Sequence, residues 1–70
     1  MSEQITPHLA FKADVLAFCE RMGMPKTTFG ENAIGDPNFV ADLERKGREP
    51  RWSTMQKVRL WMAEQERGAA

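Results

Sequence analysis

Two polar residues, Asn38 and Asp42, stand four positions apart in the stretch GDPNFVADLERKGREP, residues 35–50. The amide of an asparagine can pair bidentately with the edge of adenine, and an aspartate carboxylate can accept a hydrogen bond from the amino group of cytosine. Residues four apart lie on the same side of a helix, so both side chains could meet bases in DNA. Two plainer interpretations stay open: Asn38 is a solvent-facing residue of a first turn, and Asp42 is an inert surface residue or pairs with Arg45.

Basic residues follow the same stretch and suit a different task. Cationic side chains that bind phosphates position a protein on DNA without reading its sequence. The chain has no net charge, yet residues 1–44 hold three basic and seven acidic residues, whereas residues 45–70 hold seven basic and three acidic residues. The second part therefore offers a local charge of +4 to an anionic partner. The candidate phosphate contacts in it are Arg45, Lys46, Arg48 and Arg51, with a solvated loop as the alternative.

The other reactive side chains form no catalytic or metal-binding pattern. His8 is the only histidine, which leaves no second one for a metal site or a proton relay, and we expect it at the surface or in a cap. Cys19 is the only cysteine, so we expect a packed thiol rather than a disulfide within the chain. The sequence thus favours a protein that is not an enzyme and uses no metal or cofactor.

Helix start and stop signals predict four helices, at about residues 7–22, 26–34, 37–46 and 54–66. Proline suits the first position of a helix and glycine the position after its end. No segment alternates apolar and polar residues between turn signals, so an all-α fold is expected. The signals are Thr6-Pro7 and Gly23 for the first helix, Gly35 after the second, Asp36-Pro37 and Gly47 around the third, and a capping box from Ser53 to Gln56 for the last.

Apolar residues at helical spacing predict the core. In the first helix two neighbouring lines, one with Leu9 and Leu16 and one with Phe11 and Phe18, predict a wide apolar face. Gly30 lies within the second helix, where glycine is unfavourable unless another segment approaches closely. We expect Phe39 to pack against a neighbouring helix, with contact to a thymine methyl as the alternative. The other expected core residues are Val15, Met22, Phe29, Ala33, Val40, Leu43, Met55, Val58 and Met62, with Met24, Trp52 and Trp61 in the core or in a dimer interface.

Seventy residues are enough for one small domain. A domain of this size buries only about 60% of its unfolded surface, so a partner is expected to help stabilise it. No apolar run approaches the roughly 20 residues of a membrane span, and the first residues do not resemble a secretory signal. The expected location is the cytoplasm.

Two short helices joined by a tight turn, with Gly30 at their crossing, are typical of the unit that presents its second helix to the DNA major groove. The run from Lys26 to Met55 resembles, without a gap, the lambda-repressor-like (XRE-type) helix-turn-helix family. The family usually has Ser or Thr where this chain has Pro25, so the start of the second helix is expected to be capped differently. The matching features are Lys26, Phe29-Gly30, Asp36, Val40, Leu43 and the segment from Gly47 to Thr54, which fits G-[KR]-x-P-x₃-T.

This resemblance implies a small four-helix domain that regulates transcription by binding double-stranded DNA. It implies that Lys26, with Thr27 beside it, clamps the phosphate backbone, and that the helix at 37–46 enters the major groove. The residues then facing bases are Asn38, Pro37, Asp42 and Ala41.

One three-turn helix reads few bases, so we expect a homodimer that spans two half-sites about 34 Å apart and pairs through the last helix. On DNA such a protein is associated with the nucleoid, and a chain of this kind resembles small regulators of phages, plasmids and integrative elements.

A different class of function also fits the sequence. A helix-turn-helix scaffold can act by binding another protein, as an antitoxin or an antiactivator, through the acidic first part of the chain. The neutral total charge and Asp42 on the expected reading face motivate this alternative.

Overall fold

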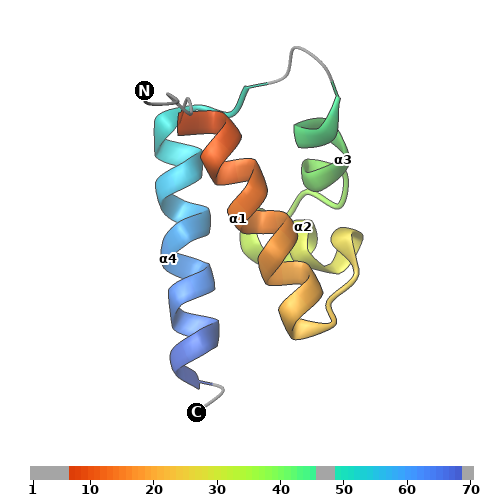
Figure 1. The fold of residues 1–70 in the computed structure, drawn as a ribbon, viewed down its shortest axis with the longest axis vertical. Helices are drawn as coiled ribbons and strands as arrows, with labels where there is room; N and C mark the ends of the chain where they lie inside the picture. The colour runs from red at the N-terminus through yellow and green to blue at the C-terminus, as the bar shows by residue number, and fades with distance from the viewer. Residues whose placement is uncertain (1–6, 46–48, 69–70) are drawn as a thin grey trace, which may run out of the picture.

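The computed structural model describes residues 7–45 and 49–68, and within them the regular elements are four helices. α1 spans Pro7–Met22, α2 Lys26–Ile34, α3 Phe39–Glu44 and α4 Trp52–Gly68. α4 follows the long dimension of a body of 37 × 26 × 22 Å, and α3 lies at the opposite edge, with α1 and α2 between them (Figure 1). These described residues include no strand, so the all-α prediction is confirmed.

α1 has its predicted bounds because a glycine ends it. Gly23 adopts a left-handed φ of +62°, and the next amide, of Met24, donates to the Cys19 carbonyl at 2.9 Å. Thr6, the expected cap, lies outside the described residues. Only the line of Phe11, Val15 and Phe18 is fully buried, whereas Leu9 is 48% exposed. The buried face of α1 is narrower than the two apolar lines predicted.

α2 also has its predicted bounds, and its two ends are built differently. Pro25 stands at the N-cap with no side-chain hydrogen bond, as expected for a proline in place of Ser or Thr. Gly35 follows the helix in the left-handed region, at φ +72°, and its amide donates to the carbonyl of Glu31 at 3.0 Å. The turn from α2 to α3 therefore depends on a residue without a Cβ.

Gly30 is buried where α2 meets the turn into α3. Its carbonyl accepts a hydrogen bond from the Asp36 amide at 3.0 Å. A Cβ placed on Gly30 would overlap the Asp36 carbonyl oxygen and would come within 3.2 Å of the Phe39 Cβ. The close approach predicted for this glycine is confirmed.

α3 is shorter than the predicted segment 37–46. Pro37 and Asn38 form a turn, and the helix begins at Phe39. The Asp36 carboxylate accepts a hydrogen bond from the Asn38 amide at 3.0 Å, so Asp36 stabilises this turn before the first helical residue. The helix ends at Glu44, because Arg45 is already extended. Gly47, the expected stop, lies outside the described residues.

α4 begins two residues before the predicted start and runs to Gly68. The Arg51 carbonyl accepts the Met55 amide at 3.0 Å, which is the first bond of this helix. Ser53 and Gln56 both lie inside α4, so the predicted capping box is wrong.

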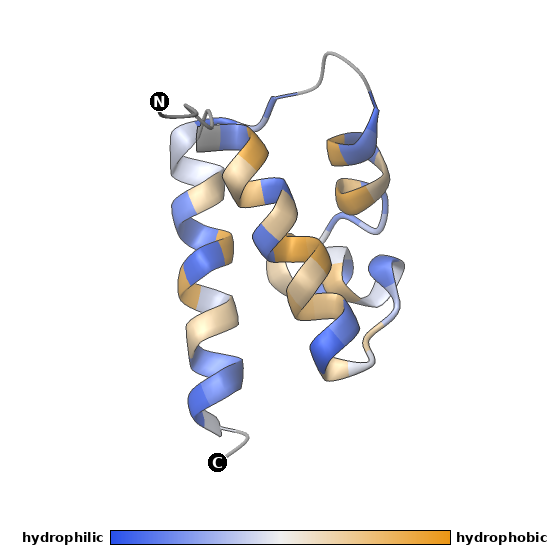
Figure 2. Cartoon of the chain, in the orientation of Figure 1, coloured by the Kyte–Doolittle hydropathy of each residue, from blue (hydrophilic) through white to orange (hydrophobic). Residues whose placement is uncertain are grey.

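Aromatic residues from all four helices or their turns meet in one core. Phe18 and Phe29 pack with Trp61, with ring centroids 5.7 and 5.1 Å from it, and Phe39 packs edge-on against Phe11. Figure 2 shows that α1 and α3 carry much of the hydrophobic sequence, whereas long parts of α4 are hydrophilic. The fully or nearly buried residues are Phe11, Val15, Phe18, Cys19, Phe29, Ala33, Phe39, Val40, Leu43, Met55, Val58 and Met62, with Met22, Met24 and Trp61 packed against them.

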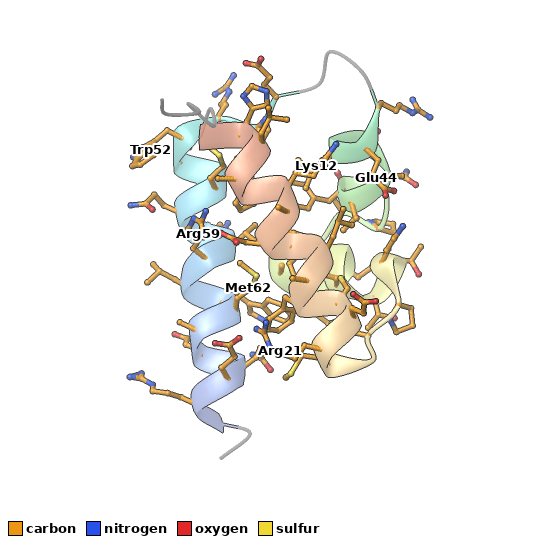
Figure 3. All side chains as sticks on the ribbon, viewed as in Figure 1. Lys12, Arg21, Glu44, Trp52, Arg59 and Met62 are labelled. Carbon is orange, nitrogen blue, oxygen red and sulfur yellow. The ribbon has the colours of Figure 1, made fainter. Side chains whose placement is uncertain are left out.

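The two tryptophans have different environments. Trp61 belongs to the core, as predicted, but Trp52 is 66% exposed, so core packing of Trp52 is wrong. Figure 3 shows the Trp52 side chain directed away from the other helices. α4 therefore presents apolar surface on two sides, one against the core and one outward.

Candidate nucleic-acid interface

The candidate base-reading residues lie on the outer side of α3 and in the turn before it. Phe39, Val40 and Leu43 point into the core, so the opposite side of this short helix faces outward. Pro37, Asn38 and Ala41 are exposed, and Asp42 is half-buried. The side-chain carboxamide of Asn38 has no hydrogen-bond partner within the described residues. Its NH₂ donor and its oxygen acceptor are therefore available to a ligand.

α2 brings its amino terminus to the same region. Lys26 and Thr27 are exposed at its first turn, where the leading backbone amides have no acceptor within the helix. Such amides and the positive end of the helix dipole attract phosphate oxygens. The first turn of α2 can thus contribute both a cation and backbone donors.

Lys26 is already engaged in the free protein. Its Nζ lies 3.1 and 3.3 Å from the two carboxylate oxygens of Glu44 at the end of α3. This ion pair joins the first turn of α2 to the last turn of α3. A phosphate that binds Lys26 must share or displace Glu44.

Arg51 and Arg45 are exposed on either side of the segment that links α3 to α4. Arg51 lines a groove of about 360 Å³ between α3 and this segment. Three acidic side chains line the same groove, so its described walls are more acidic than basic. The lining residues are Asp36, Phe39, Asp42, Leu43, Glu49, Pro50, Arg51 and Thr54. Lys46 and Arg48, the other two candidate phosphate contacts, lie outside the described residues.

Two acidic partners near this region were not anticipated from the sequence. Glu44 pairs with Lys26 across 18 positions of the chain, and Glu49 lies 3.5 Å from His8 Nε2. His8 lies at the surface beside this carboxylate, with its side chain 30% exposed. Helical periodicity relates residues of one helix, so pairs between separate elements give no sequence signal.

The described residues contain no group of three or more histidine, cysteine, aspartate or glutamate side chains that could hold a metal ion. Cys19 is a packed thiol, as predicted, and burial raises its pKa, an effect that the charge of Lys26 partly opposes. Among the described residues, no helix has the length and apolarity needed to cross a bilayer. No protein-family model, curated protein or solved structure matches this chain.

Proposed function

We propose that the protein is a sequence-specific DNA-binding regulator of transcription with a lambda-repressor-like helix-turn-helix, made of α2, the turn and α3. It has no catalytic role and no cofactor, works in the cytoplasm and on the nucleoid, and belongs to the small regulators of phages, plasmids or integrative elements. It binds as a homodimer, with the segment 37–46 of each copy in the major groove.

One observation carries this proposal. The turn into α3 is locked against α2 at Gly30, while Asn38 and Ala41 stay exposed beside the first turn of α2. A helix-turn-helix needs this combination, because the first helix must fix the second one and leave its outer side open to the groove.

Base reading and phosphate binding have different carriers in this proposal. Asn38 pairs with an adenine, Pro37 and Ala41 contact neighbouring bases, and Asp42 accepts from a cytosine. Lys26 and Thr27 bind one strand of the backbone. Arg45, Lys46, Arg48 and Arg51 bind phosphates on the other side of α3.

Fluorescence anisotropy with DNA from upstream of the coding region, at two salt concentrations, tests these roles. Asn38→Ala is expected to cost about 1–3 kcal/mol on the specific site and little on random DNA. Arg51→Ala is expected to weaken both DNAs alike and to flatten the plot of log affinity against log salt by roughly 0.9. Equal losses of Asn38→Ala on both DNAs would refute base reading by this residue.

Arg21→Gln is the matched control, since it also removes one positive charge but from the end of α1, where Arg21 pairs with Glu66 of α4 (Figure 3). It is expected to leave the salt slope unchanged.

The acidic walls of the groove beside α3 favour a second candidate, a scaffold that binds a basic protein. That candidate is supported if Asn38→Ala and Arg51→Ala leave DNA affinity unchanged while a protein partner copurifies.

A further inference from the structure

The outward side of α4 carries the most exposed large apolar side chains among the described residues. Trp52 is 66% and Leu60 67% exposed, and they stand eight positions apart on one helix. At about 100° per residue they are separated by only about 80° around the helix axis, so they share a face. Gln56 and Ala63 lie on the same face. We name this surface, formed by Trp52, Gln56, Leu60, Ala63 and Arg67, the outer face of α4.

The two ends of the outer face differ in shape. Near its carboxyl end a shallow groove, mostly apolar, is lined by Leu60, Ala63, Glu64, Glu66 and Arg67. Near its amino end the Trp52 ring projects away from the protein (Figure 3). The Trp52 ring of one α4 can meet the groove of a second α4 only if the two helices run in opposite directions.

The charges beside the outer face have the same antiparallel arrangement. Lys57 and Glu64 are exposed on one flank of Leu60, three positions before it and four after it, and neither has an ion-pair partner within the described residues. In an antiparallel pair of helices centred on Leu60, Lys57 of each copy lies opposite Glu64 of the other. Trp52 then lies beside Arg67 of the other copy, where a guanidinium can stack on the indole.

We propose that the outer face of α4 binds the same face of a second copy of this chain, antiparallel and centred on Leu60. One surface patch thereby contacts itself about a two-fold axis, which is the usual form of a homodimer interface. This proposal rests on the proposed function, in which the protein binds DNA as a homodimer. The contact is one helix wide, so the dimer dissociates measurably with dilution.

Analytical ultracentrifugation of the full chain without DNA, over a range of concentrations, tests the interface. Leu60→Glu is expected to raise the dimer dissociation constant by at least about tenfold, because it buries an unpaired carboxylate at the centre of the contact. Lys57→Glu is expected to raise the dimer dissociation constant about tenfold. It places a glutamate opposite Glu64 of the other copy, and the two-fold axis repeats this repulsion once more. The swapped variant Lys57→Glu/Glu64→Lys restores opposite charges and is expected to return the constant to within about threefold of the native value.

Glu20→Lys is the control, since it reverses an exposed charge on α1 rather than α4 and should not change the dissociation constant. All variants are checked for native helix content by circular dichroism. A chain that is monomeric at every concentration, or a dimer that Leu60→Glu leaves intact, overturns the proposal, and so does failure of the swapped variant to recover. DNA affinity is measured separately. A dimer that does not bind DNA contradicts the proposed function alone. A monomer that still binds DNA contradicts the interface and the homodimer, and leaves DNA binding by α2 and α3 standing.

Discussion

Gly30 lies where the packing leaves no room for a Cβ. Gly30→Ala should gain about 1 kcal/mol of helix propensity. It also drives a methyl group into the Asp36 carbonyl, which cannot move without displacing α3. We expect a net destabilisation of about 1–3 kcal/mol. Each kcal/mol lowers the Tm of a domain of this size by about 4–8 °C, which a thermal melt measures.

Gly68→Ala is the matched substitution, because Gly68 is also helical but has open space around its Cβ position. It is expected to leave the Tm unchanged or slightly raised. If both variants melt at the native temperature, the close contact at Gly30 has no energetic weight.

Cys19 is a free cysteine that is packed in the core. Its thiol is buried and its pKa is raised above the ordinary value of 9.0, so it forms less of the reactive thiolate at a given pH. Iodoacetamide at pH 8 is therefore expected to alkylate the native protein more slowly than the protein in denaturant. Because the pKa of Cys19 is higher in the folded state than in the unfolded state, folding favours the neutral thiol. This contribution to the free energy of unfolding is complete below the unfolded-state pKa and is lost as the pH rises through the folded-state pKa. Equal rates of alkylation in the two states would contradict the burial.

The ion pair between Lys26 and Glu44 joins two elements, α2 and α3, and both side chains are partly exposed. Glu44→Gln is expected to reduce stability by less than about 1 kcal/mol. It should tighten DNA binding by about twofold to fivefold, because it frees Lys26 for phosphate and removes a negative charge near the DNA.

The control for this prediction is Asp14→Asn, which breaks a similar ion pair, between Asp14 of α1 and Arg59 of α4, on the side away from α3. It should cost similar stability without a change in DNA affinity. Weaker DNA binding by Glu44→Gln would mean that the pair orients α3 for binding rather than competing with phosphate.

The helices could be predicted from the sequence where local signals fix their ends. Glycines in the left-handed region stop α1 and α2 at the predicted residues. α3 begins two residues later than predicted because its contact with α2 decides its start, and α4 begins two residues earlier than predicted. The chain turns at Pro37 and Asn38 before α3, since the Asp36 amide donates to the Gly30 carbonyl and the Asp36 carbonyl accepts from the Phe39 amide. Trp52 continues α4 toward its amino end although its own side chain finds no place in the core.

The candidate interface could be predicted only in its exposed residues. Ala41 follows from the buried positions of α3 by helical periodicity, whereas Asn38 lies in the turn before this helix. The engagement of Lys26 by Glu44 depends on how two helices cross, which neither propensity nor spacing encodes. The same is true of the acidic walls around Arg51.

α3 and α4 lie at opposite edges of the protein (Figure 1). A dimer that pairs through α4 therefore carries its two α3 helices at its outer ends. We expect cooperative binding to two half-sites whose centres are one helical turn of about 34 Å, or a larger multiple, apart. Gel shifts on DNAs whose spacing increases in steps of about half a turn measure this. Tightest binding to half-sites that overlap would contradict the arrangement.

The separation of these two edges also bears on engineering. A peptide or a fluorescent domain fused after residue 68 would lie on the α4 side and leave α3 accessible. The same domain inserted between α3 and α4 would lie beside α3 and could cover it. Likewise, the residues of the outer face of α4 can be replaced to change the dimer interface while the residues of α3 stay the same. Substitutions on the outer face of α4 and on the exposed side of α3 can therefore be combined, because both sets of residues lie outside the core that holds the two helices.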